Sequence, residues 1–364
     1  MKSSFKIFTV FGIPIELHIS FLLLIVFIYI IAFLGIISLY LAFLITLLFI
    51  TVVIHELSHS YYAQKYGVKI ERIVLYPIGG VSAMEEIPKD PNKELKISIA
   101  GPLSNIIIAV FCLIGLIIIG GLGSLTLFSL FITNTPSADL SLFLANFFGV
   151  NLILGLFNLI PAFPMDGGRV LRAYLARNRD YVDATKTAAK IGRQFAILMA
   201  IVGVFLFNPI LVLIAVFIYL GANQEYQAIL VSSMLEGIRV KDIMTRDVKT
   251  LSPDNTVSEA IYTMFQQKHM GYPVMNNNEL MGIITFDDIS RIPENERNIP
   301  IGDIMSKNLI LASPNEGVAT VFEKINIKGI GRVPVVENGE LVGIVSKTDI
   351  VKTLEMLEKQ RIGS

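Results

Sequence analysis

Long apolar runs fill the first part of the chain, whereas the last part alternates short apolar and polar segments. Residues 19–54 contain no charged side chain, and about 20 apolar residues are enough for one membrane-spanning helix. This run therefore predicts two helices, separated near residues 35–38. The second helix is expected to continue to about Tyr66, with Gly67 as its stop.

Four more apolar segments suit membrane-spanning helices, which brings the predicted number of spans to six. They cover about residues 97–119, 140–163, 188–207 and 209–230. The segment 140–163 is interrupted near its end by Asn158 and Pro161, and Pro164 follows directly. These spans define a predicted membrane domain over residues 1–232.

A short segment after the second predicted helix has the composition of β-structure. Residues 70–84 are rich in Ile and Val and contain Gly79-Gly80, which predicts short strands joined by a tight turn. Such strands could pair with an extended peptide by strand addition. An ordinary cytoplasmic hairpin explains the pattern equally well.

The distribution of charge predicts how the chain crosses the membrane. Charged residues make up 16% of the chain, below the roughly 25% of soluble domains. Lys and Arg gather after the second and fourth predicted helices and are absent after the first, third and fifth. The positive-inside rule then predicts a multi-pass protein of the cell membrane with both termini in the cytoplasm.

Two features of the composition exclude other classes of protein. The net charge of +0 gives no indication of nucleic-acid binding. The single cysteine, Cys112, excludes an intrachain disulfide and a multi-cysteine metal site.

A metal-binding motif lies near the end of the second predicted helix. His55 and His59 flank Glu56 in the pattern His-Glu-x-x-His. On a helix the two imidazoles lie one turn apart on one face, so both can bind one Zn²⁺ while the glutamate holds the attacking water. Ionisable groups at membrane depth are rare and usually functional.

A catalytic zinc usually has three protein ligands, and Asp166 is the best candidate for the third. It follows an insertion of helix-breaking residues at the end of an apolar span, where irregular backbone survives only if protein or a wet cavity covers it. Glu85 and Glu86 lie at a suitable spacing from His59 but without a helical pattern. The other histidines fit less well: His18 suits the membrane interface, and His269 belongs to the later part of the chain.

The two motifs together resemble the site-2 protease family of intramembrane zinc metalloproteases. The matching residues are His55, Glu56, His59, Asn158, Pro161, Asp166 and Gly167. The resemblance implies one zinc ion bound by the two histidines and Asp166, with Glu56 as the general base. It also implies an oxyanion hydrogen bond from Asn158 and transmembrane helices of other proteins as substrates. Residues 101–105 resemble a further family segment, although helix packing or capping explains them equally well.

The last part of the chain is an internal repeat with an offset of 61 residues. Pro273-Val274 recurs as Pro334-Val335, and Asp288-Ile289 recurs as Asp349-Ile350. Several matches in one register indicate a true repeat. Its units are predicted over residues 238–296 and 297–357.

The repeat resembles a tandem pair of CBS (cystathionine-β-synthase) domains. This resemblance implies adenine nucleotide binding (ATP, ADP or AMP), with hydroxyls at phosphate and carboxylates at ribose. The matching residues are Thr285, Asp288, Ser346 and Asp349. A purely structural role is the alternative, since these residue types also cap helices. CBS domain pairs of two chains often associate face to face, so a homodimer is expected.

The expected fold class is therefore a polytopic α-helical membrane protein with six transmembrane helices and a small β segment, followed by an α/β tandem CBS domain. The expected function is intramembrane zinc proteolysis under nucleotide control. One alternative is a divalent-cation transporter or channel with a regulatory CBS pair, although a permeation path needs no paired histidines beside a base. The other is an inactive membrane receptor that senses nucleotide.

Overall fold

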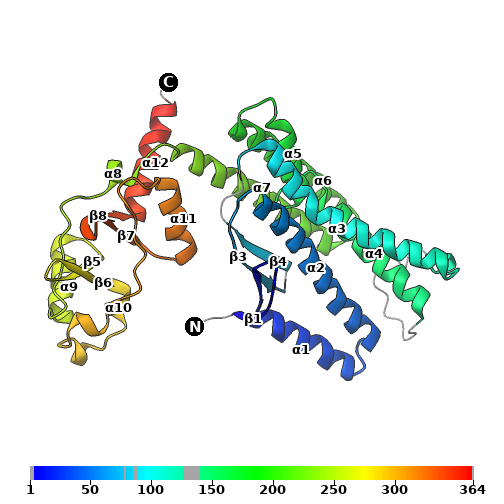
Figure 1. Ribbon diagram of the computed structural model, residues 1–364, viewed down its shortest axis with the longest axis horizontal. Helices are drawn as coiled ribbons and strands as arrows, with labels where there is room; N and C mark the ends of the chain where they lie inside the picture. The colour runs from blue at the N-terminus through cyan, green and yellow to red at the C-terminus, as the bar shows by residue number, and fades with distance from the viewer. Residues whose placement is uncertain (1–3, 78, 85–87, 126–138, 363–364) are drawn as a thin grey trace. The chain divides into compact units, whose positions relative to one another are not determined.

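The computed structural model describes residues 4–77, 79–84, 88–125 and 139–362. The chain divides into two compact units, residues 1–227 and residues 228–364. The candidate ligands Glu85 and Glu86 lie outside the described residues. The elements are labelled in Figure 1, and each unit is described by itself.

The first unit is mainly helical. Its helices are α1 (Ile19–Phe33), α2 (Leu39–Lys65), α3 (Pro91–Ile118), η1 (Leu122–Ser124), α4 (Leu140–Asn158), α5 (Asp166–Leu175), α6 (Tyr181–Phe205) and α7 (Pro209–Met234). In the described part of the chain, α2, α3, α4, α6 and α7 are long and apolar enough to cross a membrane. These five helices agree with five of the six predicted spans.

The sixth predicted span is not confirmed. Helix α1 has 15 residues, which at about 1.5 Å per residue reach roughly 22 Å, less than the ~30 Å of a hydrocarbon core. Its start is set by a strand that runs up to His18, whose ring nitrogen accepts a hydrogen bond from the Ser20 amide and caps the helix. Outside the apolar run, the chain therefore forms β-structure that the hydrophobic pattern did not predict.

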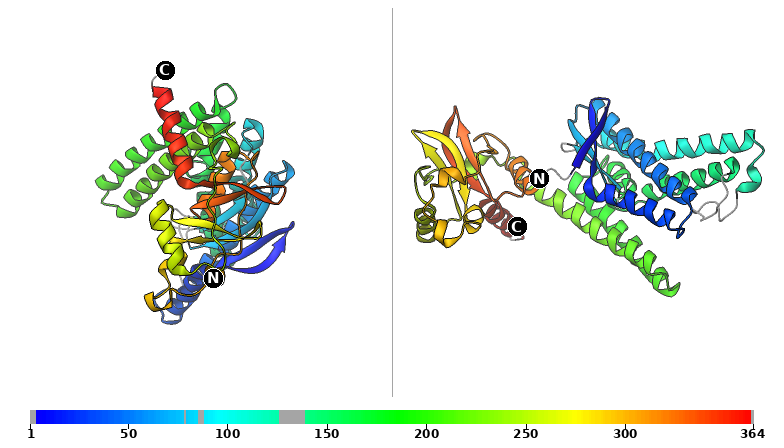
Figure 2. Two further views of the ribbon diagram at one scale, coloured as in Figure 1. Left: turned by 90° about the vertical axis from the view of Figure 1, so that its left-hand side faces the viewer. Right: turned by 90° about the horizontal axis from the view of Figure 1, so that it is seen from below.

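A four-stranded sheet lies against the helices of this unit (Figures 1 and 2). Its strands, in spatial order, are β1 (Ser4–Val10), β2 (Ile13–His18), β3 (Ile70–Tyr76) and β4 (Gly79–Met84). Strands β1 and β2 are antiparallel and joined by Phe11-Gly12, both at positive φ as in a type I′ turn. Strand β2 pairs parallel to β3, and β3 pairs antiparallel to β4. The predicted hairpin at 70–84 is confirmed, and β4 ends up at an edge of the sheet.

Helix α5 was not predicted, and it decides how the second motif is presented. The chain leaves α4 at Asn158, passes through residues 159–165 without regular structure, and re-enters a helix at Asp166. Gly167 and Gly168 let this helix pack tightly on the preceding loop. A methyl group on Gly167 would lie 2.2 Å from the Ile160 carbonyl oxygen, and one on Gly168 would lie 2.6 Å from the Phe163 amide nitrogen.

The second unit repeats one αβ arrangement with the predicted offset. Its elements are α8 (Val240–Ile243), α9 (Val257–Gln267), β5 (Gly271–Asn276), β6 (Glu279–Thr285), α10 (Phe286–Ser290), η2 (Glu294–Glu296), η3 (Ile301–Asp303), α11 (Val318–Lys328), β7 (Arg332–Glu337), β8 (Glu340–Ser346) and α12 (Lys347–Ile362). The β5–β6 and β7–β8 hairpins have the same register, each with an irregularity in the same place. Figure 2 shows the two hairpins next to each other.

The two repeats exchange short segments, so neither builds its sheet alone. Thr245 pairs with Ile344 of the second repeat, and Ser306 pairs with Ile283 of the first, both as antiparallel bridges. The methionine before each of these residues fills the space above a glycine: Met244 lies on Gly343 and Met305 on Gly282. This exchange holds the two repeats together as one folding unit.

Candidate functional site

Helix α2 presents two histidines side by side in the interior of the first unit. His55 is 6% exposed and His59 is 7% exposed. Their ring centroids are 4.7 Å apart, and their Nε2 atoms are 3.1 Å apart. The spacing of four residues therefore gives one face of the helix two nitrogen atoms that point at one place.

Helix α5 brings a carboxylate to the same place from more than 100 residues further along the chain. The Oδ2 atom of Asp166 is 3.1 Å from Nε2 of His55 and 3.1 Å from Nε2 of His59. Asp166 is the first residue of α5, where the positive end of the helix dipole favours a negative charge. The structure thus brings together the three residues that the two motifs nominated.

The outer nitrogens of both imidazoles are held by hydrogen-bond acceptors. His59 Nδ1 is 2.7 Å from the carbonyl oxygen of Ile97, which can only accept, so this nitrogen carries the proton. His55 Nδ1 is 2.6 Å from Oδ1 of Asn105. Both contacts come from α3, which packs antiparallel to α2.

A chain of amides fixes the orientation of Asn105. The Nδ2 of Asn105 donates to Oδ1 of Asn151 at 3.2 Å, and Nδ2 of Asn151 donates to the Phe147 carbonyl at 2.9 Å. Since that carbonyl can only accept, each amide has one orientation, and Oδ1 of Asn105 faces His55 as an acceptor. Both asparagines are fully buried, so His55 Nδ1 is held as a donor.

This arrangement leaves three lone pairs facing one another. With Nδ1 protonated, a neutral imidazole has an unprotonated Nε2, and Asp166 adds a carboxylate oxygen. The three atoms are 3.1 Å from one another, with no hydrogen between them to make the contacts favourable. A shared cation relieves the repulsion. Two ligand atoms on a tetrahedral zinc at 2.0–2.1 Å are about 3.3 Å apart, so the three residues fit Zn²⁺.

The backbone of α3 lies directly over the two rings at Gly101. A methyl group at this position would lie 2.2 Å from Nε2 of His59 and 2.6 Å from Nε2 of His55. Any larger residue would therefore occupy the space of the metal ligands. The segment 101–105 thus contributes both a glycine and an amide to the site.

Glu56 lies beside the ligands and against the edge strand β4. A methyl group on Gly80 would lie 2.6 Å from Cγ of Glu56, so the strand backbone runs past this side chain. The motif therefore places a carboxylate next to both the metal ligands and an extended segment.

Asn158 ends α4, and its amide donates to the Leu154 carbonyl of its own helix at 3.0 Å. One of its two amide hydrogens is therefore engaged, and one remains for another acceptor. Its role as an oxyanion donor stays a prediction.

A buried ion cluster connects α5 with three other helices. Arg172 is 3% exposed, and its Nε donates to Oε1 of Glu94 on α3 at 2.7 Å. Its Nη1 donates to Oε1 of Glu225 on α7 at 2.8 Å, and its guanidinium lies 5.0 Å from the Tyr181 ring centroid on α6. The cluster holds α5, and with it Asp166, against its neighbours.

Two features of the site were not predicted: the contact of Asn105, within the segment 101–105 that resembles a family segment, with His55, and the Arg172 cluster. A signal existed in each case. Asn105 and Asn151 are amides inside otherwise apolar helices, and buried amides are usually hydrogen bonded. Arg172 lies one helical turn beyond Gly168, but nothing local names Glu94 or Glu225 as its partners.

The residues of the second unit that were predicted to bind nucleotide form hydrogen bonds that cap helices. The Thr285 hydroxyl donates to Oδ2 of Asp288 at 2.6 Å, and the Ser346 hydroxyl donates to Oδ2 of Asp349 at 2.7 Å. The Thr285 oxygen also accepts from the Asp288 amide as a helix cap. These residues therefore cap helices, as the structural alternative expects. Their further role in ligand binding stays a prediction.

The two repeats differ in charge near these caps, and one of the differences is Arg332. Thr285 and Asp288 line a cavity of about 480 Å³ that Arg332 also lines. Arg332 donates a hydrogen bond to the carbonyl of Gly271, which is the residue at its own position in the first repeat. Burial lowers the pKa of this guanidinium, with Tyr272 and Asp349 acting in the opposite direction. The cavity therefore contains a cation with no equivalent in the other repeat.

Comparisons with known proteins agree with the geometry. A model described as Peptidase family M50 matches residues 42–201, and a CBS domain model matches residues 240–295 and 301–355. Zinc metalloprotease MJ0392 of Methanocaldococcus jannaschii is 41% identical over 359 residues, which cover 98% of this chain and 98% of that protein. Rip3 of Mycobacterium tuberculosis is 30% identical over 319 residues, which cover 83% of this chain and 77% of Rip3.

A solved structure, the site-2 protease from Methanocaldococcus jannaschii, is 45% identical and covers 61% of this chain and 95% of its own, with a TM-score of 0.43. The match to MJ0392 extends over nearly the full length of both proteins. The resemblance found in the two motifs is confirmed: the chain belongs to peptidase family M50, the site-2 protease type of zinc metalloprotease, and carries a tandem pair of CBS domains.

Proposed function

We propose that this protein cleaves transmembrane helices of other membrane proteins with a zinc ion held by His55, His59 and Asp166. The observation that supports it best is the triangle of three lone-pair atoms, 3.1 Å apart. Two of the three are held in the metal-binding tautomer by α3. A zinc ion bound there supplies a Lewis acid for water and for the scissile carbonyl.

Glu56 moves the proton in this proposal. Its carboxylate lies beside the metal ligands, so it can take a proton from the attacking water and later give it to the leaving amine. The free hydrogen of the Asn158 amide is the candidate donor to the oxyanion of the tetrahedral intermediate. Such a donor typically contributes about 10²–10³ in kcat.

The edge strand β4 supports an extended substrate. A helix satisfies its own backbone hydrogen bonds, so a transmembrane helix must unwind before its peptide bond can be attacked. Strand β4 lies at the sheet edge and runs past Glu56. An unwound segment that pairs with this edge gains the backbone hydrogen bonds it lost, and it lies next to the base.

The cleavage site is proposed to lie near the cytoplasmic side of the cell membrane, with both termini in the cytoplasm. The distribution of Lys and Arg supports this orientation. Water from that side reaches the zinc site over the shortest path. Cleavage there releases a cytoplasmic fragment of the substrate.

The test is cleavage of a membrane-protein substrate in vesicles by wild type and by the Glu56→Gln variant. We expect the variant to retain one zinc per chain and to lose cleavage, whereas His55→Ala loses both. Glu71→Gln, on strand β3 and exposed, is the matched control and keeps both. Normal cleavage by Glu56→Gln would contradict the assignment of the base.

We further propose that the CBS pair binds one adenine nucleotide in the cavity lined by Thr285, Asp288 and Arg332. The asymmetry supports a single site, because the position equivalent to Arg332 in the first repeat is Gly271. A guanidinium and a hydroxyl suit phosphate oxygens, and the Asp288 carboxylate suits ribose hydroxyls. The bound nucleotide would control the protease, and pairing of two CBS pairs would give a homodimer.

Calorimetric titration of the full-length protein with ATP, ADP and AMP tests this proposal. We expect one nucleotide per chain and a loss of binding in Asp288→Asn. The matched substitution in the other repeat, Asp349→Asn, should weaken binding far less than Asp288→Asn, because Asp349 acts on the site only through its charge near Arg332. Two equivalent sites, or no binding by any of the three nucleotides, would contradict it.

A further inference from the structure

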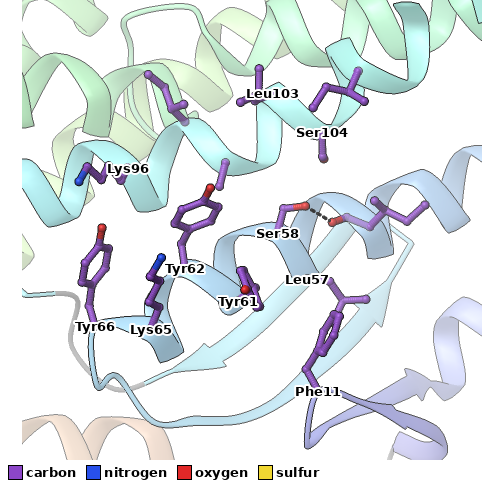
Figure 3. Close-up of a pocket in the computed structure, with 14 residues that line it drawn as sticks. Phe11, Leu57, Ser58, Tyr61, Tyr62, Lys65, Tyr66, Lys96, Leu103 and Ser104 are labelled. Atoms are coloured by element: carbon purple, nitrogen blue, oxygen red, sulfur yellow. Dashed lines mark hydrogen bonds between the residues drawn. The ribbon is translucent and has the colours of Figure 1, made fainter. Parts of the chain in front are cut away.

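A groove lies between α2 and α3, next to the zinc site. It has a volume of about 850 Å³ and is closed at one place by Phe11 of the β1–β2 turn (Figure 3). Ala100 of α3 lines it, whereas the next residue, Gly101, lies on the imidazoles. Neither the zinc ligands nor Glu56 line the groove, and the mechanism above does not use it.

The two ends of this groove differ in chemistry. Lys65, Tyr66 and Lys96 gather at one end, with Tyr62 beside them (Figure 3). Both lysines are exposed. Ile54 and Ile107 line the groove 11 residues away from the two lysines along α2 and α3 respectively. Because the helices are antiparallel, the apolar ends of the two helices lie together and so do the cationic ends.

Polar atoms in the apolar part of the groove are already satisfied. The Ser58 hydroxyl donates to the Ile54 carbonyl at 2.8 Å, and the Ser104 hydroxyl donates to the Gly101 carbonyl at 2.6 Å. Each serine thus forms its hydrogen bond within its own helix. The apolar part of the groove therefore offers hydrocarbon contacts, and its serine hydroxyls are not available to donate hydrogen bonds to a polar ligand.

The length of the groove matches one leaflet of a bilayer. Eleven residues of helix rise span about 16 Å, and half of a ~30 Å hydrocarbon core is about 15 Å. Lysine and tyrosine at one end suit the headgroup region, where lysines extend their ammonium groups toward phosphates. A transmembrane substrate helix needs twice this length, so the dimensions favour a lipid.

We infer that this groove binds one anionic phospholipid, with its phosphate headgroup at Lys65 and Lys96 and an acyl chain running toward Ile54 and Ile107. The acyl chain lies along the helix that carries His55 and His59, and along the helix that holds their outer nitrogens. Two positive charges select an anionic headgroup over a zwitterionic one. The inference goes beyond the proposed function and does not depend on which peptide is cleaved.

The chain contains no tryptophan, which allows a direct test by fluorescence. Leu103→Trp places a single reporter in the groove, and Leu198→Trp, on the exposed face of α6, is the matched control. Each variant is reconstituted into phosphatidylcholine vesicles that contain increasing fractions of brominated phosphatidylglycerol as the quencher. Ile107→Trp serves as a second reporter at the apolar end.

We expect half-maximal quenching in the groove at a phosphatidylglycerol fraction about 10- to 30-fold lower than at the control, as two lysines near an anionic surface imply. Brominated phosphatidylcholine should quench both positions equally. Lys65→Gln combined with Lys96→Gln should bring the groove to the control value. Zinc content is measured throughout to confirm that each variant is folded.

Three outcomes would overturn the inference. The first is equal quenching of the groove and the control by phosphatidylglycerol, which indicates ordinary surrounding lipid. The second is selective quenching that survives removal of both lysines. The third is weak quenching by either lipid together with loss of cleavage in Leu103→Trp at full zinc content, which would assign the groove to the substrate.

Discussion

Replacing Gly101 by alanine tests the geometry of the zinc site with one methyl group. In α3 this position lies over both metal-binding rings, and the added carbon would lie 2.2 Å from Nε2 of His59 and 2.6 Å from Nε2 of His55. The rings cannot simply rotate away, because Ile97 and Asn105 hold their outer nitrogens. Either the helices move apart or the ligand triangle opens.

The size of the effect follows from the displacement that is needed. Ordinary van der Waals contact begins near 3.4 Å, so the methyl group and the His59 ring must separate by about 1.2 Å. A misplacement of 1 Å in an active site can reduce the rate by about 10²-fold. Intrinsic propensity acts in the opposite direction, since alanine favours a helix over glycine by about 1 kcal/mol. A loss of function is therefore steric in origin and does not reflect a weaker helix.

The assay compares bound zinc per chain and the rate of substrate cleavage in Gly101→Ala and Gly115→Ala. The second variant adds a methyl group to the same helix, 3.2 Å from Cδ1 of Leu144 at the flexible end of a side chain. We expect Gly101→Ala to lose at least 10²-fold in cleavage and most of its zinc, and Gly115→Ala to stay within about threefold of wild type. Full zinc content and a rate within about threefold for Gly101→Ala would refute the close approach of α3 to the rings.

Three further predictions concern the first unit. Asn105→Ala should weaken zinc binding about 10- to 100-fold by releasing the His55 ring, measured by competition with a chelating dye, and unchanged affinity would count against the amide chain. Arg172→Ala should destabilise the first unit by about 3–5 kcal/mol because it leaves Glu94 buried without its partner, and a thermal midpoint in detergent equal to that of wild type would disagree. Removal of zinc with a chelator should lower the same midpoint and stop cleavage, both restored by added zinc; a midpoint that zinc does not change would argue against a bound ion.

The residues of the zinc site could be named from the sequence because their signals are local. Four residues separate His55 and His59, and that spacing alone places both on one face of a helix. Asp166 was recognised because proline and glycine interrupt an apolar span, which is unusual at membrane depth. The repeat in the second unit was equally accessible, because residues 61 positions apart share one register.

Strands β1 and β2 and helix α5 could not be predicted in the same way. Strand β2 is stabilised by parallel pairing with β3, whose residues lie more than 50 positions later, so no local pattern announces it. Helix α5 has only 10 residues, and helices of this length depend on tertiary packing. The Arg172 cluster supplies that packing.

The sequence by itself determined the chemistry: the types of metal-binding side chain, the order of the apolar spans and the duplication in the second unit. Each of these depends on periodicity or composition within a short stretch, which the chain carries wherever it folds. Tertiary structure alone decided which atoms meet. It placed Asn105 and the Ile97 carbonyl behind the rings, Gly101 above them and the Arg332 guanidinium on the Gly271 carbonyl. These contacts join residues far apart in the chain, and their geometry is set by how whole helices and strands pack.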